Sequence, residues 1–363
     1  MNNPVLDEQA KPRLVFDFVR PPTKKLLEVD NGEAPRESLL GYVQLRERGW
    51  PLSASDDRWH GRLGAIRQKL LFTAEIPSFK MVAAWKAADV VVVTTRISFI
   101  LALVAKLLNK KIVFLDAMCE EVPKRLWRRL PIKWALGMAD ACIGLSRSQA
   151  HHWAERLNVP ESVFSPVNYG IDAGFYKRSD DCSAHGDVKP YMLAVGRDPR
   201  RDFDTLVEAA KTLGWELKLV TPAYLVPKSV SSSGCVHVFD SLPYDELFEL
   251  YANARCAVIP IRRDTTYMSG IRATMEAMLL GCPVVASRTP GMEDYFTGGE
   301  DVIYFEPERS DDLVSAIRRL IEDAELRERL TKNAKSKVVQ SYSVSNYADA
   351  LEKILGALSA KPA

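Results

Sequence analysis

The chain has 363 residues, of which 47% are hydrophobic and 26% charged, and its formal net charge is +2 at pH 7. This length favours about two domains, and the balance of charges excludes a protein that binds nucleic acid through an overall positive field. The six cysteines form no CxxC pair, so we expect neither a zinc site nor a disulfide framework. Residues 1–13 lack the apolar core of a secretory signal, and Arg96 interrupts the most apolar stretch, so no transmembrane segment is expected.

Short apolar runs alternate with helical patterns through the first half of the chain. The runs are rich in Val, Ile and Phe and are bounded by polar turns, which is typical of strands in a buried parallel sheet. Helical patterns separate them, the clearest at 36–49 and 148–158. The expected strands are 13–19, 90–93, 111–116, 141–146 and 162–167.

A polar stretch, 177–190, interrupts this alternation and is typical of an interdomain linker. After it the alternation restarts, which predicts an α/β protein with two doubly wound domains and a ligand crevice at the carboxyl ends of each set of strands. We place these domains at 1–178 and 179–343, and we expect the last helix, within 344–363, to pack back on the N-terminal domain. The expected strands of the second half are 191–196, 215–220, 235–240, 256–260, 283–287 and 302–305, and the expected helices are 204–214, 244–254, 270–281 and 310–323.

The turn after the strand at 191–196 carries three arginines, Arg197, Arg200 and Arg201. In doubly wound folds this kind of turn, at the carboxyl end of a parallel strand, is where phosphates bind, and guanidinium groups match phosphate oxygens. The turn therefore predicts a phosphate site, with a solvated charged loop as the alternative.

The stretch YMSGIRATMEAMLLGCPVV, residues 267–285, predicts a helix that starts at Ser269 and Gly270 and ends at Gly281. Ser is a good N-cap residue, and the first N–H groups of a helix attract anions. If this helix start and the arginine turn face one ligand, they would hold a diphosphate together. Glu276, roughly one and a half turns inside, is placed to accept hydrogen bonds from vicinal hydroxyls such as those of a ribose. A salt bridge on the helix face is the alternative.

Four stretches of the second half resemble the donor domain of the retaining family-four glycosyltransferases, the glycosyl transferases group 1, which have the two-Rossmann GT-B fold. They are AVGRDPRRDFDTLVEAA, VHVFDSLPYDELFELYANARCAVIPI, SGIRATMEAMLLGCPVVASRTPGMEDYF and GGEDVIYFEPERSDDLVSAI. Fainter similarity lies in ADACIGLSRSQAHHW and VNYGIDAGFY. The resemblance implies a GT-B protein with an N-terminal acceptor domain and a C-terminal nucleotide-sugar domain that face a cleft.

The resemblance also implies an activity: transfer of a sugar from a nucleotide sugar with retained anomeric configuration. No metal and no cofactor is required in such enzymes, because the nucleotide sugar is a substrate. UDP-sugars are the first expectation for the donor and GDP-sugars the second. The acceptor is expected to be a glycan or a lipid-linked molecule in polysaccharide or glycoconjugate biosynthesis.

Site residues follow from the positions that match the family's motifs. In that family an arginine after a glycine and a later basic residue hold the diphosphate, a glutamate holds the ribose and a loop contacts the base. Both basic residues are also expected to be catalytic, because they stabilise negative charge on the departing diphosphate. The matching residues are Gly196, Arg197 and Arg201 for the diphosphate, Glu276 for the ribose, Leu242 for the base, and the backbone of Ser269, Gly270 and Ile271 for the sugar.

Three positions depart from the family's pattern. Met268 stands eight positions before Glu276, where many members have a first glutamate. No histidine occurs in 111–123, where many members have one after a strand, so Asp116 is expected to orient the acceptor hydroxyl or the donor sugar, with helix capping as the alternative. Gly32 remains from a glycine-rich loop and is expected to contact phosphate or acceptor.

The segment PKRLWRRLPIKWALG, residues 123–137, mixes five basic residues with Trp127 and Trp134. This composition is typical of a surface that meets anionic lipid, and an ordinary amphipathic surface helix is the alternative. We therefore expect a cytoplasmic protein that can attach to the inner face of the membrane.

One other function remains as an alternative, and two more are disfavoured. A non-catalytic GT-B scaffold that binds nucleotide without transfer is favoured by Met268 and by the missing histidine. A nicotinamide-dependent dehydrogenase needs GxGxxG after a strand and a P-loop ATPase needs GxxxxGK[ST], and the sequence contains neither motif.

Overall fold

The structure is a computed structural model that describes residues 11–18, 22–55, 77–94, 96–116, 118, 121–177, 190–232 and 234–359. Residues 178–189 of the predicted linker, and also Cys119 and Cys182, lie outside these ranges. The chain forms two compact units. Unit 1 contains Met1–Leu145, Ala150–Val167 and Val344–Ala363, and unit 2 contains Ser146–Gln149 and Asn168–Ser343. Unit 2 thus begins earlier in the chain than the predicted start at residue 179.

Unit 1 is built on a six-stranded parallel sheet with the strand order β2-β1-β3-β4-β5-β6. The apolar runs of the sequence form its strands, and Cα pairing puts Val91 between Val15 and Ile112. The direction of winding reverses between β1 and β3, as in other doubly wound folds. The strands are β1 (Leu14–Asp17), β2 (Leu52–Ser55), β3 (Val90–Val93), β4 (Lys111–Leu115), β5 (Ala141–Gly144) and β6 (Phe164–Pro166).

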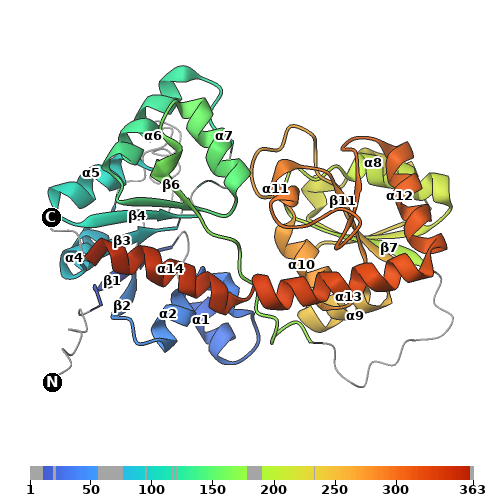
Figure 1. Ribbon diagram of the computed structural model, residues 1–363, viewed down its shortest axis with the longest axis horizontal. Coiled ribbons are helices and arrows are strands. Elements are labelled where there is room, and N and C mark those ends of the chain that lie inside the picture. The colour runs from blue at the N-terminus through green and yellow to red at the C-terminus, as the bar shows by residue number, and fades with distance from the viewer. Residues whose placement is uncertain are drawn as a thin grey trace, which may run out of the picture. The chain divides into compact units, whose positions relative to one another are not determined.

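Helices cover both faces of this sheet (Figure 1). On one face α4, α5, α6 and α7 enclose a core in which Val91 of the sheet and Trp85 of α4 are fully buried. On the other face, the ring of Tyr42 from α2 meets the ring of Phe16 edge-on at 5.4 Å. The helices are α1 (Pro22–Asp30), η1 (Arg36–Leu39), α2 (Tyr42–Glu47), α4 (Phe79–Ala87), α5 (Phe99–Leu107), α6 (Leu126–Met138), α7 (Arg147–Leu157), η2 (Glu161–Val163) and α14 (Val344–Ser359).

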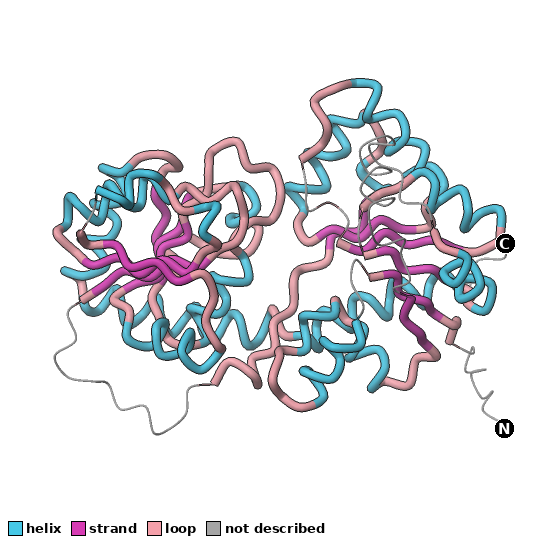
Figure 2. The backbone as a smooth tube through the Cα atoms, turned by 180° about the vertical axis from the view of Figure 1, so that it is seen from behind, coloured by secondary structure: helices cyan, strands magenta, loops and turns pink. Residues whose placement is uncertain are grey.

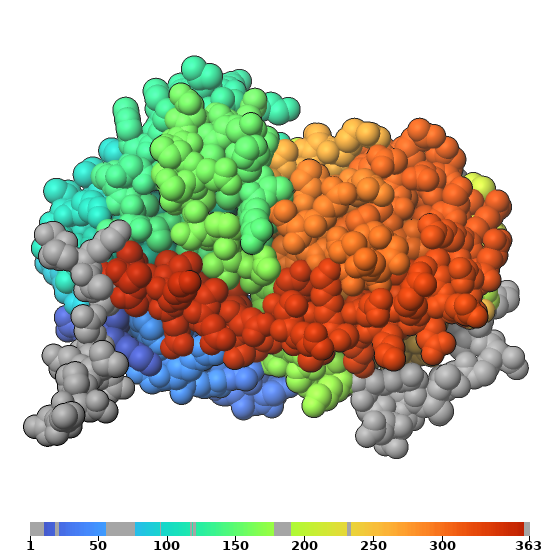
Figure 3. Space-filling view, in the orientation of Figure 1, coloured from blue at the N-terminus to red at the C-terminus, as the bar shows by residue number. Residues whose placement is uncertain are grey.

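The C-terminal helix α14 belongs to unit 1 although it follows unit 2 in the sequence. Figure 3 shows α14, in red, against the blue surface of the first helices. Glu352 of α14 lies 2.7 Å from Arg48 Nη1, and its carboxylate also accepts a hydrogen bond from Trp50 Nε1 at 2.5 Å. Buried Leu351 and Leu355 lie on one face of the helix. Apolar packing and ionic contacts therefore both hold α14 against the rest of unit 1.

The prediction of one continuous helix over 36–49 is wrong, because the helix is interrupted in the middle of this range. The chain forms η1, passes through left-handed conformations at Leu40 (φ 49°) and Gly41 (φ 85°), and only then starts α2. A Cβ at Gly41 would lie 2.5 Å from Leu351 Cδ1 of α14. The break follows from this close approach, because glycine alone provides both the positive φ and the space.

Unit 2 is built on a second six-stranded parallel sheet, with the order β12-β11-β10-β7-β8-β9. In chain order this is the 3-2-1-4-5-6 arrangement of the Rossmann fold, read from the opposite edge. The strands are β7 (Tyr191–Val195), β8 (Glu216–Val220), β9 (Val236–Phe239), β10 (Cys256–Ile259), β11 (Val284–Ser287) and β12 (Ile303–Phe305).

Alternate residues of these strands face two separate cores. Leu193 belongs to the core beneath α9 and α10, and Met192 to the core beneath α8 and α12. Helix α13 joins both cores, since Leu330 packs into the second and Val338 into the first. Figure 2 shows the strands of each unit as a layer between helices. The helices are α8 (Phe203–Leu213), η3 (Ala223–Leu225), η4 (Lys228–Ser232), α9 (Tyr244–Asn253), α10 (Ile271–Leu279), α11 (Pro290–Glu293), α12 (Ser310–Glu322) and α13 (Ala324–Ser341).

These two sheets, each with helices on both faces, confirm the predicted fold class: α/β with two Rossmann-like, doubly wound domains.

Candidate functional site

The strand order of unit 2 indicates where a ligand binds. Winding reverses between β7 and β10, and doubly wound folds bind ligands outside the carboxyl ends of the strands at this point. The turn 196–202 leaves β7 at this edge, and the loop 260–270 leaves β10. The two segments are bonded directly, because Arg262 N donates a hydrogen bond to Arg200 O at 2.9 Å. The arginine turn and the loop that leads to α10 are therefore neighbours.

Arg201 is the buried cation of this edge, with only 6% of its surface exposed. Its Nε and Nη1 groups are buried and make no hydrogen bond to any residue in the described ranges. A Cβ at Gly196 would lie 2.7 Å from Nε, and a Cβ at Gly270 would lie 3.3 Å from Nη1. Two glycines thus make room for a guanidinium whose donors are unused. Because unpaired buried donors destabilise the fold, an anion that accepts from them would bind favourably.

The electrostatic setting of Arg201 also suits an anion. Burial lowers the pKa of Arg201 from its ordinary value, and the charges of Asp198 and Glu276 act in the opposite direction. A guanidinium remains protonated under physiological conditions despite such a shift. The site therefore keeps a positive charge in a setting of low dielectric, where attraction to phosphate is stronger than in water.

The start of α10 adds further donors beside Arg201. Gly270, with φ 84°, is the N-cap residue, so the prediction of Ser269 as the N-cap is wrong. The positive φ at the cap position selects glycine. Ser269 Oγ is buried and, among the described residues, has no hydrogen-bond partner. The first N–H groups of α10, from Ile271 onward, have no partner within the helix, and the helix dipole favours an anion there. We call Gly196, Arg201, Ser269 and Gly270 the Arg201 cluster.

Arg197 and Leu242, two other predicted donor contacts, lie in different surroundings. Arg197 follows Gly196 at the end of β7, and its side chain is exposed, unlike that of Arg201. Leu242 is half-buried in the loop before α9 and packs against the core beneath α9 and α10. Contacts of these residues with a nucleotide stay predictions.

Glu276 is buried on α10 and its carboxylate is already engaged. Oε1 accepts hydrogen bonds from Arg272 Nε at 2.9 Å and from the hydroxyl of Tyr176 at 3.1 Å, and Oε2 accepts one from the hydroxyl of Tyr251 at 3.4 Å. Burial, followed by the charge of Glu276, raises the pKa of Tyr251 well above its ordinary value, so this hydroxyl remains a donor. The salt bridge that the sequence leaves open as an alternative is present, and a ribose would meet a carboxylate held in a network.

Aromatic residues surround the outer side of this network. Arg272 Nη2 donates hydrogen bonds to the hydroxyls of Tyr176 and Tyr244, both at 3.1 Å. The ring of Phe175 meets that of Tyr244 edge-on at 4.8 Å. Sequence reasoning missed these residues, although the spacing of Arg272 and Glu276, one helical turn apart, is a visible signal for an ion pair.

Asp198 and Tyr267 form a second pair that sequence reasoning missed. The hydroxyl of Tyr267 donates a hydrogen bond to Asp198 Oδ1 at 2.6 Å. The charge of Asp198 also raises the pKa of Arg201 more than that of Glu276 does, so the pair borders the Arg201 cluster. Met268 points elsewhere, because a Cβ at Gly291 would lie 2.8 Å from its Sδ. No pattern in the sequence joins Asp198 to Tyr267, since they come from two different loops.

The predicted acceptor-side residues lie in unit 1. Asp116 follows β4 in a left-handed conformation (φ 52°), and its N–H donates a hydrogen bond to Ile143 O at 2.9 Å. Gly32 lies in the turn that ends α1, not in the loop that follows β1, and its N–H donates to Val29 O at 3.0 Å. The positive φ of Gly32 (75°) serves that turn. The acceptor roles of both residues stay predictions.

Asp17 is a charged residue of unit 1 that sequence reasoning missed. It is fully buried at the carboxyl end of β1, next to the point where winding reverses. Its backbone oxygen accepts hydrogen bonds from N and Oγ1 of Thr94, at 3.1 and 3.0 Å. An aspartate at the end of the apolar run LVFD is a signal that the sequence contains, because buried carboxylates are uncommon.

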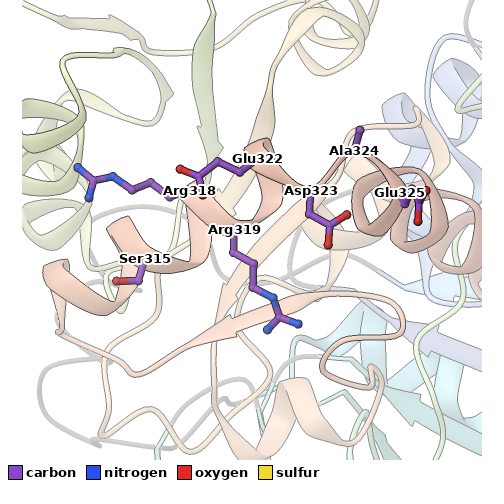
Figure 4. A pocket seen from close by; sticks show the side chains of 7 residues that line it. All are labelled: Ser315, Arg318, Arg319, Glu322, Asp323, Ala324 and Glu325. Atoms are coloured by element: carbon purple, nitrogen blue, oxygen red, sulfur yellow. The ribbon is translucent and has the colours of Figure 1, made fainter.

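Other features of the described residues bear less on the site. The pocket in Figure 4, about 620 Å³, lies between α12 and the start of α13 and is lined by both basic and acidic side chains, among them Arg318, Arg319 and Glu322. It contains none of the predicted site residues.

The described ranges hold no group of three or more His, Cys, Asp and Glu side chains that could bind a metal ion. Within the same ranges, no helix has the length and apolar character needed to cross a membrane.

Comparisons with known proteins agree with this geometry. Residues 200–353 match a family described as "Glycosyl transferase-like". An uncharacterized glycosyltransferase of Methanocaldococcus jannaschii is 32% identical over 104 residues, which cover 29% of this chain. The match spans only 26% of that relative's length.

Solved structures match over nearly the whole chain. HepE from Anabaena, in complex with UDP and glucose, is 16% identical with a TM-score of 0.70, and the match covers 95% of this chain and 100% of that one. Sucrose-phosphate synthase from Thermosynechococcus elongatus is 18% identical with a TM-score of 0.72, over 95% and 98% of the two chains. Together with the two doubly wound units, these similarities show that the chain has the GT-B fold and that its C-terminal region is similar to the glycosyl transferase-like family.

Proposed function

We propose that the protein is a retaining glycosyltransferase that moves a sugar from a nucleoside-diphosphate donor to a glycan or lipid-linked acceptor. The observation that carries this proposal is Arg201, a buried guanidinium between Gly196 and Gly270 whose Nε and Nη1 have no hydrogen-bond partner in the part of the chain that the structure describes. A diphosphate supplies the oxygens that such donors need, and guanidinium groups bind phosphate oxygens well. The adjacent start of α10 favours the same ligand.

In the proposed reaction the bond between the anomeric carbon and the diphosphate breaks, and an acceptor hydroxyl replaces the diphosphate. Negative charge grows on the departing diphosphate. Arg201, the N–H groups at the start of α10 and Ser269 Oγ are in place before the reaction, so they stabilise this charge without reorganisation. Arg197, an exposed residue of the same turn, would neutralise the diphosphate oxygens that face solvent. We assign no metal to the reaction, since these groups supply positive charge and donors.

The donor is proposed to be a UDP-sugar, with a GDP-sugar next. HepE, which shares the fold, is described in complex with UDP and glucose, and this supports the first choice. Glu276 would hold the ribose, and Leu242 would contact the base. The acceptor is proposed to belong to polysaccharide or glycoconjugate biosynthesis, with Asp116 orienting it, and we place the reaction in the cytoplasm.

A second candidate function is a non-catalytic scaffold that binds nucleotide without transfer. It is favoured by the side chain of Met268, which packs at Gly291, and by the network that already occupies Glu276. In a scaffold, the nucleotide would stabilise unit 2 for a partner rather than take part in a reaction.

Calorimetry tests the proposal with UDP, GDP, ADP, dTDP and NAD against the wild type, Glu276→Ala and Arg201→Met. We expect one nucleoside diphosphate to bind the wild type and to lose at least tenfold in affinity in both variants. Transfer assays with the matching nucleotide sugar then separate the two functions, and the anomeric configuration of the product, read by NMR, tests retention. Binding of NAD alone, or of no nucleotide, would contradict both functions.

A further inference from the structure

Helix α6 of unit 1 has an apolar face on the side that points to solvent. Its inner face is buried through Ile132, Ala135 and Leu136. On the opposite side, Leu126, Leu130 and Trp134 follow one another at intervals of four residues and are 76%, 49% and 56% exposed. Trp127, beside Leu126, is 51% exposed. The outer face of a helix on a globular domain is normally polar, so this face requires an explanation.

The apolar surface continues onto the neighbouring helix α5. The two helices run side by side (Figure 1), and the ring of Phe99 lies 5.6 Å from the ring of Trp134. Leu103 and Leu107 follow Phe99 at intervals of four residues, which continues the same face, and they are 38% and 76% exposed. We call Leu103, Leu107, Leu126, Trp127, Leu130 and Trp134 the α5–α6 face.

The charges along α6 and the segment that precedes it are all of one sign. Between Val122 and Ala139 the sequence has five basic residues and no acidic residue. The guanidinium of Arg128 lies over the ring of Trp127, at 5.1 Å from its centroid, and Lys124 and Arg125 are exposed at the start of α6. Arg129 differs from them, since it donates to the carbonyl oxygens of Pro123 and Arg156 and thereby fixes the start of the helix.

We propose that the α5–α6 face docks on an anionic lipid surface, with Trp127 and Trp134 at the level of the headgroups. Apolar side chains enter the boundary of the acyl chains, tryptophan prefers the interface, and basic residues attract anionic headgroups. α6 has 13 residues, which suits a helix that lies in the plane of the interface.

Charge argues against a second copy of the chain as the occupant. Two copies that met through this face would bring their basic residues together, and like charges across an interface oppose association. An anionic bilayer satisfies both the apolar and the cationic part of the surface. This inference does not depend on the donor chemistry of unit 2.

Flotation with vesicles of phosphatidylcholine, with and without phosphatidylglycerol, tests the proposal on the full chain. We expect binding only to the vesicles that contain phosphatidylglycerol, weakened by salt, together with a blue shift of tryptophan fluorescence. Two variants probe the two parts of the face: Trp127→Ser with Trp134→Ser, and Lys124→Gln with Arg125→Gln and Arg128→Gln. Each is expected to lower the bound fraction more than tenfold.

A matched control removes the same charge elsewhere, through Arg318→Gln, Lys332→Gln and Lys335→Gln, which are exposed on unit 2. This control is expected to bind like the wild type. Absence of binding to anionic vesicles, equal binding to neutral vesicles, or equal loss in the control would overturn the proposal. So would a wild-type dimer that the tryptophan variant dissociates without any vesicle binding. Thermal melting checks that each variant folds, and either variant alone suffices for the test.

Discussion

Arg272 and Glu276 form an ion pair one turn apart on α10, with Nε of the arginine 2.9 Å from Oε1 of the glutamate. The two side chains differ in burial, since that of Glu276 is 7% exposed and that of Arg272 is 40% exposed. The arginine therefore closes the network around Glu276 at its solvent side. A ribose that binds Glu276 must share the carboxylate with this arginine or displace it.

Because Arg272 and Glu276 form an ion pair, substitutions at the two positions are expected to have non-additive effects on the free energy of unfolding. Arg272→Met leaves a buried carboxylate with tyrosine donors only, so we expect the free energy of unfolding to fall by about 1–2 kcal/mol. In a Glu276→Gln background the same substitution should cost less than about 0.5 kcal/mol, because no charge remains to be paired. Urea denaturation of the four proteins measures the cycle. Additive effects would show that the pair contributes nothing beyond its separate side chains.

Substitution of Arg201 is expected to weaken nucleotide binding without lowering the free energy of unfolding. Arg201→Met removes a buried charge whose Nε and Nη1 have no hydrogen-bond partner within the described ranges, so we expect stability to stay within about 0.5 kcal/mol of the wild type or to rise. Nucleoside-diphosphate affinity should fall at least tenfold. Arg200→Met is the control, since Arg200 pairs with Asp264 at 2.9 Å, and it should leave affinity nearly unchanged. A clear loss of stability in Arg201→Met would mean that the guanidinium has a structural role.

Arg197 is exposed, and its removal tests catalysis with little structural disturbance. Arg197→Ala should change the free energy of unfolding by less than about 0.5 kcal/mol, as most surface substitutions do. Turnover should fall by about 10²-fold or more if the side chain stabilises charge on the leaving diphosphate. Steady-state kinetics and thermal melting on the same preparation provide both numbers. Unchanged turnover would remove Arg197 from the mechanism.

Gly270 and Gly299 have nearly the same conformation, with φ 84° and 81°, but different surroundings. A Cβ at Gly270 would lie 2.6 Å from Ile259 Cγ2, whereas a Cβ at Gly299 meets nothing within 4 Å. We expect Gly299→Ala to cost about 1 kcal/mol through backbone strain alone, and Gly270→Ala to cost about 1–3 kcal/mol more. Equal losses in denaturation experiments would show that crowding at Gly270 relaxes without effect.

Glu352 predicts a pH dependence for unit 1. Burial acts to raise the pKa of Glu352, but hydrogen bonds from Trp50 and Arg48 outweigh burial, so the pKa in the folded state lies below its ordinary value. The carboxylate then contributes stability above the ordinary glutamate pKa, about 4.3, and loses it as the pH falls through the lowered value.

The measurement is the free energy of unfolding of the wild type and of Glu352→Gln at neutral and acidic pH. The difference between the two proteins should be about 1 kcal/mol at neutral pH and should vanish at low pH. Glu328→Gln, at an exposed glutamate of α13, is the matched control and should show no difference at either pH. A difference that persists in acid would rule out the charge of Glu352 as its source.

Local patterns of the sequence predict the strands well, because a buried parallel strand such as Val90–Val93 is apolar throughout. They also allow Arg201 to lie near the start of α10, since a doubly wound fold brings those two turns to one edge. They fail where a distant segment decides the local conformation. Leu40 and Gly41 break a helical pattern because α14 packs there, and Gly270 replaces Ser269 as the N-cap because Arg201 and Ile259 leave no space for a side chain.

The tyrosines around Glu276 show the same limit at the site. Tyr244 and Tyr251 lie on α9 and Tyr176 in the loop after β6, and no spacing in the sequence links them to α10. Only the folded structure of unit 2 shows that the Glu276 carboxylate accepts hydrogen bonds from several side chains at once.

The position of α14 also matters while the protein is being made. Most of unit 1 precedes unit 2 in synthesis, but the helix that packs against Gly41 and Trp50 is translated after all of unit 2. At about 5–20 residues per second, roughly 200 residues of synthesis separate the two parts of unit 1 by on the order of 10–40 s. During that interval, in which unit 2 is being synthesised, the surface that later receives Leu351 and Leu355 is uncovered. Unit 1, whose synthesis starts first, thus receives its last helix only after unit 2 has been translated.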